Sequence, residues 1–239
     1  MGSFTNKKDL SIGWIPYWNL APLKSEILSH MSSIRFTGGS PVQINDWLLQ
    51  GKVDLAPCSS VCLFKYPEFE MSVPCGVAVT GSVKSVYWGF YQEQQEFVSF
   101  IKEQTVRLKE IVVSSQTKYP SDVRRQVKYI CSQADSLPSC ASEKIPVFEF
   151  TKASATSSAL TKVLLNLLLG KKSYQRMLIK KNINSVTKPA QLLIGNEALL
   201  RKNEFIATID LGELWYDLTA NPFVYAVWQS KGAVLNGWR

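Results

Sequence analysis

The sequence predicts an α/β protein, and three observations support this. Short apolar runs with strand periodicity alternate along the chain with segments of helical spacing. Polar or glycine-containing turns follow several predicted strands, which is where open α/β folds bind their ligands. The 239 residues, 46% of them hydrophobic, suffice for one large or two small α/β domains with a sizeable core.

The first predicted element is a strand that begins near Ser11 and stops at Pro16, because proline is tolerated only at the ends or edges of a strand. A helix is expected from about Pro22. Asn19 lies between them, where its amide could orient a hydroxyl or carboxylate by donating and accepting hydrogen bonds. The alternative is a turn asparagine that bonds to its own backbone.

Serines follow the third predicted strand, over residues 53–57. Ser59 and Ser60 precede an apolar helix start, so they could cap that helix or leave its N–H groups free for an anion. Both interpretations stay open. The preceding elements are a helix over 23–31, a strand over 33–36 and a helix over 41–50.

The middle of the chain combines strands and helices. Its hydrophobic spacing predicts strands over 73–79, 85–90 and 110–114, helices over 93–109 and from about 120, and a loop over 134–144.

A strand over 146–150 leads into the hydroxyl-rich run 151–158 and then an apolar helix. This arrangement predicts a second anion site at a helix N-terminus, the alternative being a solvated loop. Further strands are expected over 191–194 and 222–228. The basic residues between them are expected on a solvated helix face, since no nucleic-acid motif accompanies them: Lys171, Lys172, Arg176, Lys180 and Lys181.

The overall charge and the reactive residues limit the classes of function. A net charge of +8 favours anionic partners without choosing among them. The N-terminus lacks the apolar core of a secretory signal, and the five cysteines form no CxxC pair, so we expect reduced thiols in a cytoplasmic protein. His30, the only histidine, is expected to have a surface or packing role.

Taken together, several runs resemble the successive motifs of one family. They are residues 13–23, 39–45, 53–60, 83–86, 154–160, 195–199 and 210–228. In this order they resemble the chorismate dehydratases of the futalosine route to menaquinone. The resemblance implies a two-lobed, periplasmic-binding-protein-like (type II) α/β fold with a hinge and a central ligand cleft. Residues 1–88 plus 206–239 would form one lobe and 89–205 the other, with crossovers at 85–90 and 205–211.

The implied reaction is the dehydration of chorismate to 3-(1-carboxyvinyloxy)benzoate, driven by aromatisation. The resemblance assigns Asn19 and Ser85 to the departing hydroxyl or the ring substituents. It assigns the two carboxylates to hydroxyls near the two helix starts: Ser59 and Ser60 in the first lobe, and Ser154, Thr156 and Ser157 in the second. No side-chain base is evident, so a substrate carboxylate would remove the ring proton, an effect of positioning.

The resemblance implies no metal or other cofactor, no nucleic-acid or membrane partner, and a monomer or homodimer. The sequence departs from the family at Gly195-Asn196, where Gly-Asp is common, and at Thr219-Ala220, where Thr-Gly is common. The stretch over 93–145 is longer than in short members. The chain also stops at Arg239, where relatives continue, so we expect a smaller lobe or one completed by a partner.

Two alternatives have different chemistry. The sister naphthoate-forming lyases of the same pathway are expected to use a catalytic histidine, and His30 lies outside every motif. A non-catalytic binding protein for small carboxylates would need only the fold.

Overall fold

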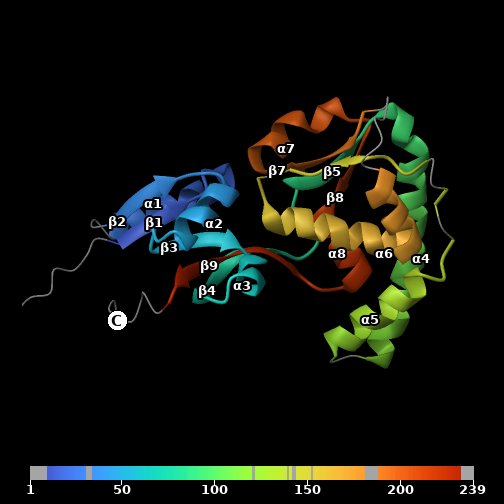
Figure 1. The fold of residues 1–239 in the computed structure, drawn as a ribbon, viewed down its shortest axis with the longest axis horizontal. Coiled ribbons are helices and arrows are strands. Elements are labelled where there is room, and N and C mark those ends of the chain that lie inside the picture. Colours follow the sequence, from blue (N-terminus) through green and yellow to red (C-terminus); the bar gives the residue numbers. More distant parts are fainter. Residues whose placement is uncertain are drawn as a thin grey trace, which may run out of the picture. The chain divides into compact units, whose positions relative to one another are not determined.

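The computed structural model describes residues 10–30, 34–119, 122–138, 140–141, 144–151, 153–180 and 188–232 (Figure 1). The chain is an α/β protein with two sheets, one in each of two compact units. Unit 1 comprises the residues up to Val77, Ala153–Thr156 and the residues from Val224 onward, and unit 2 comprises Ala78–Lys152 and Ser157–Phe223.

The strands and helices follow the predicted alternation. The strands are β1 (Leu10–Trp14), β2 (Ile34–Gly38), β3 (Leu55–Ser59), β4 (Phe69–Val79), β5 (Val86–Phe90), β6 (Phe148–Glu149), β7 (Ala190–Ile194), β8 (Ala207–Asp210) and β9 (Phe223–Lys231). The α-helices are α1 (Ala21–His30), α2 (Pro41–Leu49), α3 (Cys62–Lys65), α4 (Gln95–Lys118), α5 (Val123–Ala134), α6 (Ala155–Lys180), α7 (Gly195–Arg201) and α8 (Leu211–Thr219). Short 3-10 turns are η1 (Trp18–Leu20), η2 (Gln92–Gln94) and η4 (Lys202–Glu204).

In unit 1 the strand order is β2-β1-β3-β9-β4, with β1 parallel to β2 and β3, and β9 antiparallel to β3. Because successive side chains of a strand point to opposite faces, β1 contributes to two cores. Ile12 and Trp14 pack with Ile27 of α1, whereas Ile44 and Leu48 of α2 pack on the other face. Gly13 lies on the α2 face, where an added Cβ would come within 3.2 Å of the Ile44 Cγ2 atom, so α2 approaches β1 closely.

In unit 2 the order is β6-β7-β5-β8, with β5 antiparallel to β7 and β8. Tyr87 packs with Ala198 of α7, and its neighbour Trp88 donates a hydrogen bond to Thr161 of α6. These neighbours point to opposite faces, so α7 and α6 cover the two sides of the sheet (Figure 1). Helix α4 packs against α5 and α8.

The strand predicted over 110–114 is wrong, because these residues continue α4. Their β-branched residues favour a strand locally. Leu108, Val112 and Ser115, however, lie on the buried side of the helix, and each is at most 3% exposed. Helical spacing of buried positions, which only packing reveals, therefore outweighs local propensity.

The boundaries of the units differ from the predicted lobes. Strands β5 and β8, expected as crossovers, pair with each other inside unit 2. The units instead divide at 77/78, at 152/153, at 156/157 and at 223/224. Pairing of β5 with two strands of the second sheet is what draws residues 78–88 and 206–223 into unit 2.

The basic run lies on the second part of α6, beyond a break at Gly170, whose φ is 70°. Lys171 and Lys172 are exposed, as predicted, while Lys181 and the side chains of Arg176 and Lys180 lie outside the described residues. Among the helices that the structure describes, none is both long and apolar enough to cross a membrane.

Ala220 ends α8 in the left-handed conformation, with a φ of 54°. Only glycine adopts this conformation without a steric penalty, and glycine is common here in the family that the sequence resembles. We expect an Ala220→Gly variant to raise the free energy of unfolding by about 1 kcal/mol, because the penalty for a left-handed alanine disappears. Urea denaturation tests this, with Ala207→Gly in β8 as a control that should destabilise; a less stable Ala220→Gly protein would contradict the prediction.

Candidate functional site

The residues predicted to bind substrate in unit 1 gather at one edge of its sheet. Strands β1, β2 and β3 run parallel, so their carboxyl ends meet at the same edge. Asn19 follows β1 within η1, although its side chain lies outside the described residues. Ser59 is the last residue of β3, and Ser60 follows it. The edge therefore brings together the segments that carry the predicted amide and hydroxyls.

Ser59 is buried at this edge rather than exposed to a ligand, with 4% of its surface accessible. Its backbone N–H donates to the Asn45 Oδ1 atom at 3.2 Å, and the Asn45 Nδ2 group donates to its hydroxyl at 3.4 Å. The Gln229 Nε2 group donates to the carbonyls of Cys58 and Ser59, each at 3.0 Å. These contacts fix the end of β3, so Ser59 shapes the edge.

Asn45 and Gln229 are not predicted from the sequence to belong to the site. The signal for Asn45 is its position beside Ile44 on the buried face of α2, where a polar residue needs a partner. Gln229 gives no comparable signal, because the pairing of β9 with β3 is not evident from the sequence.

Neither serine caps α3, which corrects one of the two interpretations. The N-cap residue is Val61, which makes no side-chain capping bond, and α3 has only four residues. The Ser60 hydroxyl instead donates to the carbonyl of Val224 in β9 at 2.7 Å. Of the two interpretations, helix capping is therefore wrong.

Ser60 and Thr156 do come together. The Thr156 hydroxyl lies 3.5 Å from the Ser60 hydroxyl and accepts from the Val61 N–H at 3.5 Å. These contacts are at the long limit of a hydrogen bond, so they are weak and easily exchanged. Two hydroxyls and one backbone N–H thus converge within unit 1, which is chemistry suited to a carboxylate.

The predicted Ser85 lies at an edge of unit 2. It immediately precedes β5, and its carbonyl accepts from the Gly195 N–H at 2.7 Å, at the end of β7. Because β5 runs antiparallel to β7 and β8, its beginning lies beside their carboxyl ends. The edge therefore also carries Asn196 and Asp210. The Ser85 hydroxyl donates to the Val83 carbonyl at a long 3.5 Å.

The hydroxyl-rich run reaches both units. Ser154 and Thr156 belong to unit 1 and Ser157 to unit 2. Thr156 and Ser157 are buried at the start of α6, and Ser154 is half-buried beside them. The predicted entry into an apolar helix is confirmed, since α6 begins at Ala155.

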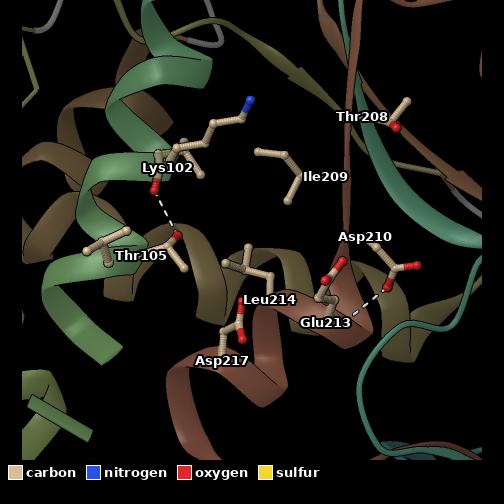
Figure 2. A pocket seen from close by; sticks show the side chains of 10 residues that line it. Lys102, Thr105, Thr208, Ile209, Asp210, Glu213, Leu214 and Asp217 are labelled. Carbon is tan, nitrogen blue, oxygen red and sulfur yellow. Dashed lines mark hydrogen bonds between the residues drawn. The ribbon is translucent and has the colours of Figure 1, made fainter. Parts of the chain in front are cut away.

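A separate cavity of about 350 Å³ lies between α4, β8 and α8 in unit 2 (Figure 2). Its lining includes the carboxylates of Asp210, Glu213 and Asp217 but only one lysine, Lys102. Asp217 is already paired with Lys109, whose Nζ lies 2.7 Å from its Oδ1. The excess of carboxylates disfavours an anionic ligand, so this cavity does not fit the predicted substrate.

His30 lies at the exposed end of α1, where its Nδ1 atom is 3.6 Å from the Glu26 carboxylate. The predicted surface role is confirmed. Among the described residues, no three histidine, cysteine or acidic side chains are grouped as metal ligands.

The sequence model of the menaquinone biosynthesis family matches residues 10–117 and 141–236. The chain belongs to the menaquinone biosynthesis family. No curated protein matches this chain. The match to the menaquinone biosynthesis family includes both sheet edges and every candidate residue named above. It omits 118–140, so α5, whose N-cap is Asp122, lies outside the part shared with the family model.

None of the five cysteines is in a disulfide bond, and their surroundings differ. Burial raises the pKa of the Cys62 thiol to about 11 and also raises the pKa of Cys58, whereas Cys75 is exposed on β4. We expect Cys75 to react fastest with a thiol reagent at pH 8, because the reactive thiolate makes up only about 0.1% of a thiol with a pKa near 11.

Stopped-flow labelling with a chromogenic disulfide checks this order. The fast phase should vanish in Cys75→Ser and persist in Cys62→Ser. A fast phase that survives in Cys75→Ser would contradict the assignment.

Proposed function

We propose that the protein is a chorismate dehydratase, a hydro-lyase that forms 3-(1-carboxyvinyloxy)benzoate and water in the futalosine pathway to menaquinone. The observation that carries the proposal is the membership of the menaquinone biosynthesis family over most of the chain. The ordered motifs of the sequence give the proposal its specific reaction, and for the same reason we assign the chain a periplasmic-binding-protein-like fold. The cytoplasm is the proposed location, in keeping with cysteines that form no disulfide bond.

In the proposed reaction, a ring proton and the ring hydroxyl leave as water and the ring becomes aromatic. A substrate carboxylate accepts the proton, so the protein needs to supply only position and hydrogen bonds. Correct positioning alone can lower a barrier by about 7 kcal/mol or more. Asn19 and Ser85 then hold the hydroxyl or the ring substituents.

The carboxylates of the substrate need hydrogen-bond donors. Thr156, the Val61 N–H and Ser60 are the best supported group. The contacts that Thr156 makes with the other two are long enough to open around an oxygen, and the Ser60 hydroxyl donates to the substrate when it turns from the Val224 carbonyl. Ser154 and Ser157 extend the same run. Ser59 supports this group through its buried contacts with Asn45 rather than by direct contact. The net charge of +8 assists capture of a dianion.

The test is incubation of the purified protein with chorismate, followed by chromatography and mass spectrometry. We expect a product lighter by one water with the absorbance of an aromatic ring. Unchanged chorismate with a thermal shift would replace the proposal by a carboxylate-binding function. If the protein gives no product and chorismate causes no thermal shift, both functions are refuted, and the assigned site residues with them.

A further inference from the structure

One carboxylate organises the connection that leads to Ser85. Asp210, the last residue of β8, accepts from the Ser82 hydroxyl at 2.8 Å and the Lys84 N–H at 2.7 Å through Oδ2, and from the Val83 N–H at 3.1 Å through Oδ1. Its Oδ1 atom also accepts from the Gly212 and Glu213 N–H groups of α8, the latter shown in Figure 2. A single side chain thus joins residues 82–84 to the start of α8.

The connection depends on this carboxylate for its shape. Lys84 has a φ of 61°, a left-handed conformation that non-glycine residues adopt only when their surroundings enforce it. The segment also lies close against α8, since a Cβ added at Gly212 would come within 2.7 Å of the Gly81 carbonyl oxygen. Without Asp210, the N–H groups of Val83 and Lys84 lose the carboxylate that accepts their hydrogen bonds.

Ser85 is therefore held from both sides. The N–H of the preceding residue, Lys84, is bound by Asp210, and the Ser85 carbonyl is bound by Gly195. Asp210 itself has little capacity for chemistry, because a carboxylate offers about four lone-pair sites and five donors already point at it.

We propose that Asp210 is a positioning residue that holds segment 82–84 in the conformation that places Ser85 for its interaction with the substrate. This inference rests on the proposed dehydratase function. A displacement of about 1 Å at a reacting group can cost about 100-fold in rate, so loss of the carboxylate should lower kcat more than it weakens binding.

The test compares Asp210→Asn with Asp122→Asn, a matched control. Asp122 caps α5 by accepting from the Arg125 N–H at 3.0 Å, but α5 is outside the part shared with the family. Amide hydrogen exchange followed by mass spectrometry should speed up over residues 81–86 in Asp210→Asn only. For Asp210→Asn we expect kcat to fall by about 10- to 100-fold with KM changed by less than about 3-fold, and Asp122→Asn to retain both values.

A double variant tests the route through Ser85. Adding Asp210→Asn to Ser85→Ala should lower kcat by less than about 3-fold beyond Ser85→Ala alone, because the two residues act as one unit. Ser82→Ala removes one hydrogen bond to Asp210 and leaves the cap of α8 intact. It replaces Asp210→Asn in this test if the Asp210→Asn protein does not fold. It should show the same pattern more weakly.

The outcomes separate this inference from the proposed function. Unchanged exchange over 81–86, a rise in KM alone, or fully additive losses would overturn the positioning role. An inactive wild-type protein would refute the dehydratase function, and with it the assigned role of Ser85, whereas the exchange comparison would still report whether Asp210 holds the segment.

Discussion

A variant that combines Asn19→Ala and Ser85→Ala is expected to lose chorismate dehydration by about 1000-fold or more in kcat/KM. Each side chain is proposed to stabilise the departing hydroxyl or the ring substituents, and removal of one such hydrogen-bond donor typically costs about 100- to 1000-fold. The two residues come from different units, since Asn19 belongs to unit 1 and Ser85 to unit 2. We expect each single variant to be strongly impaired as well, because each removes one of the two proposed hydrogen-bonding groups.

The matched controls are Asn203→Ala in η4 and Ser99→Ala in α4, two exposed residues of the same types that have no proposed role in the site. Both should keep full activity. Asn19→Asp adds a further test, because a carboxylate there should raise KM by repelling the substrate carboxylates. Steady-state kinetics compare these six variants with the wild-type protein. Full activity in the double variant, with folding verified by circular dichroism, would eliminate this pair from the site.

Trp88→Ala is expected to destabilise unit 2 by about 3 to 5 kcal/mol, the range for truncating a large aromatic in a core. Trp88 lies in the centre of β5, is fully buried and packs edge-on against Phe148 with ring centroids 5.4 Å apart. Its indole N–H donates to the Thr161 hydroxyl at 3.1 Å, so the variant also leaves a buried hydroxyl without that partner.

Chemical denaturation followed by circular dichroism measures the effect. Because the chain has two compact units, two transitions can occur, and only that of unit 2 should move to lower denaturant. Leu200→Ala, at a side chain that is 71% exposed in the same unit, is the control and should change stability by less than about 0.5 kcal/mol. A loss below about 1 kcal/mol in Trp88→Ala would contradict the packing described for this sheet.

Local sequence patterns predict most of the elements and the segments that carry the candidate site. Strands such as β1 and β5 are short apolar runs with clear ends, and helix α2 carries its start signal in Ser40, whose side chain caps it as part of a capping box. These features are local, so a pattern of a few residues predicts them. The ordered motifs likewise pointed to the menaquinone biosynthesis family, which the family match confirms.

Tertiary packing determines which residues of those segments face one another. It continued α4 through 110–114, because burial of Leu108 and Val112 outweighs strand propensity. It buried Ser59 against Asn45, brought Ser60 to Thr156 across 96 positions of sequence, and bound Asp210 to residues 82–84. Contacts over such separations depend on strand order and on the pairing of β9 with β3, and no local pattern of residues specifies either.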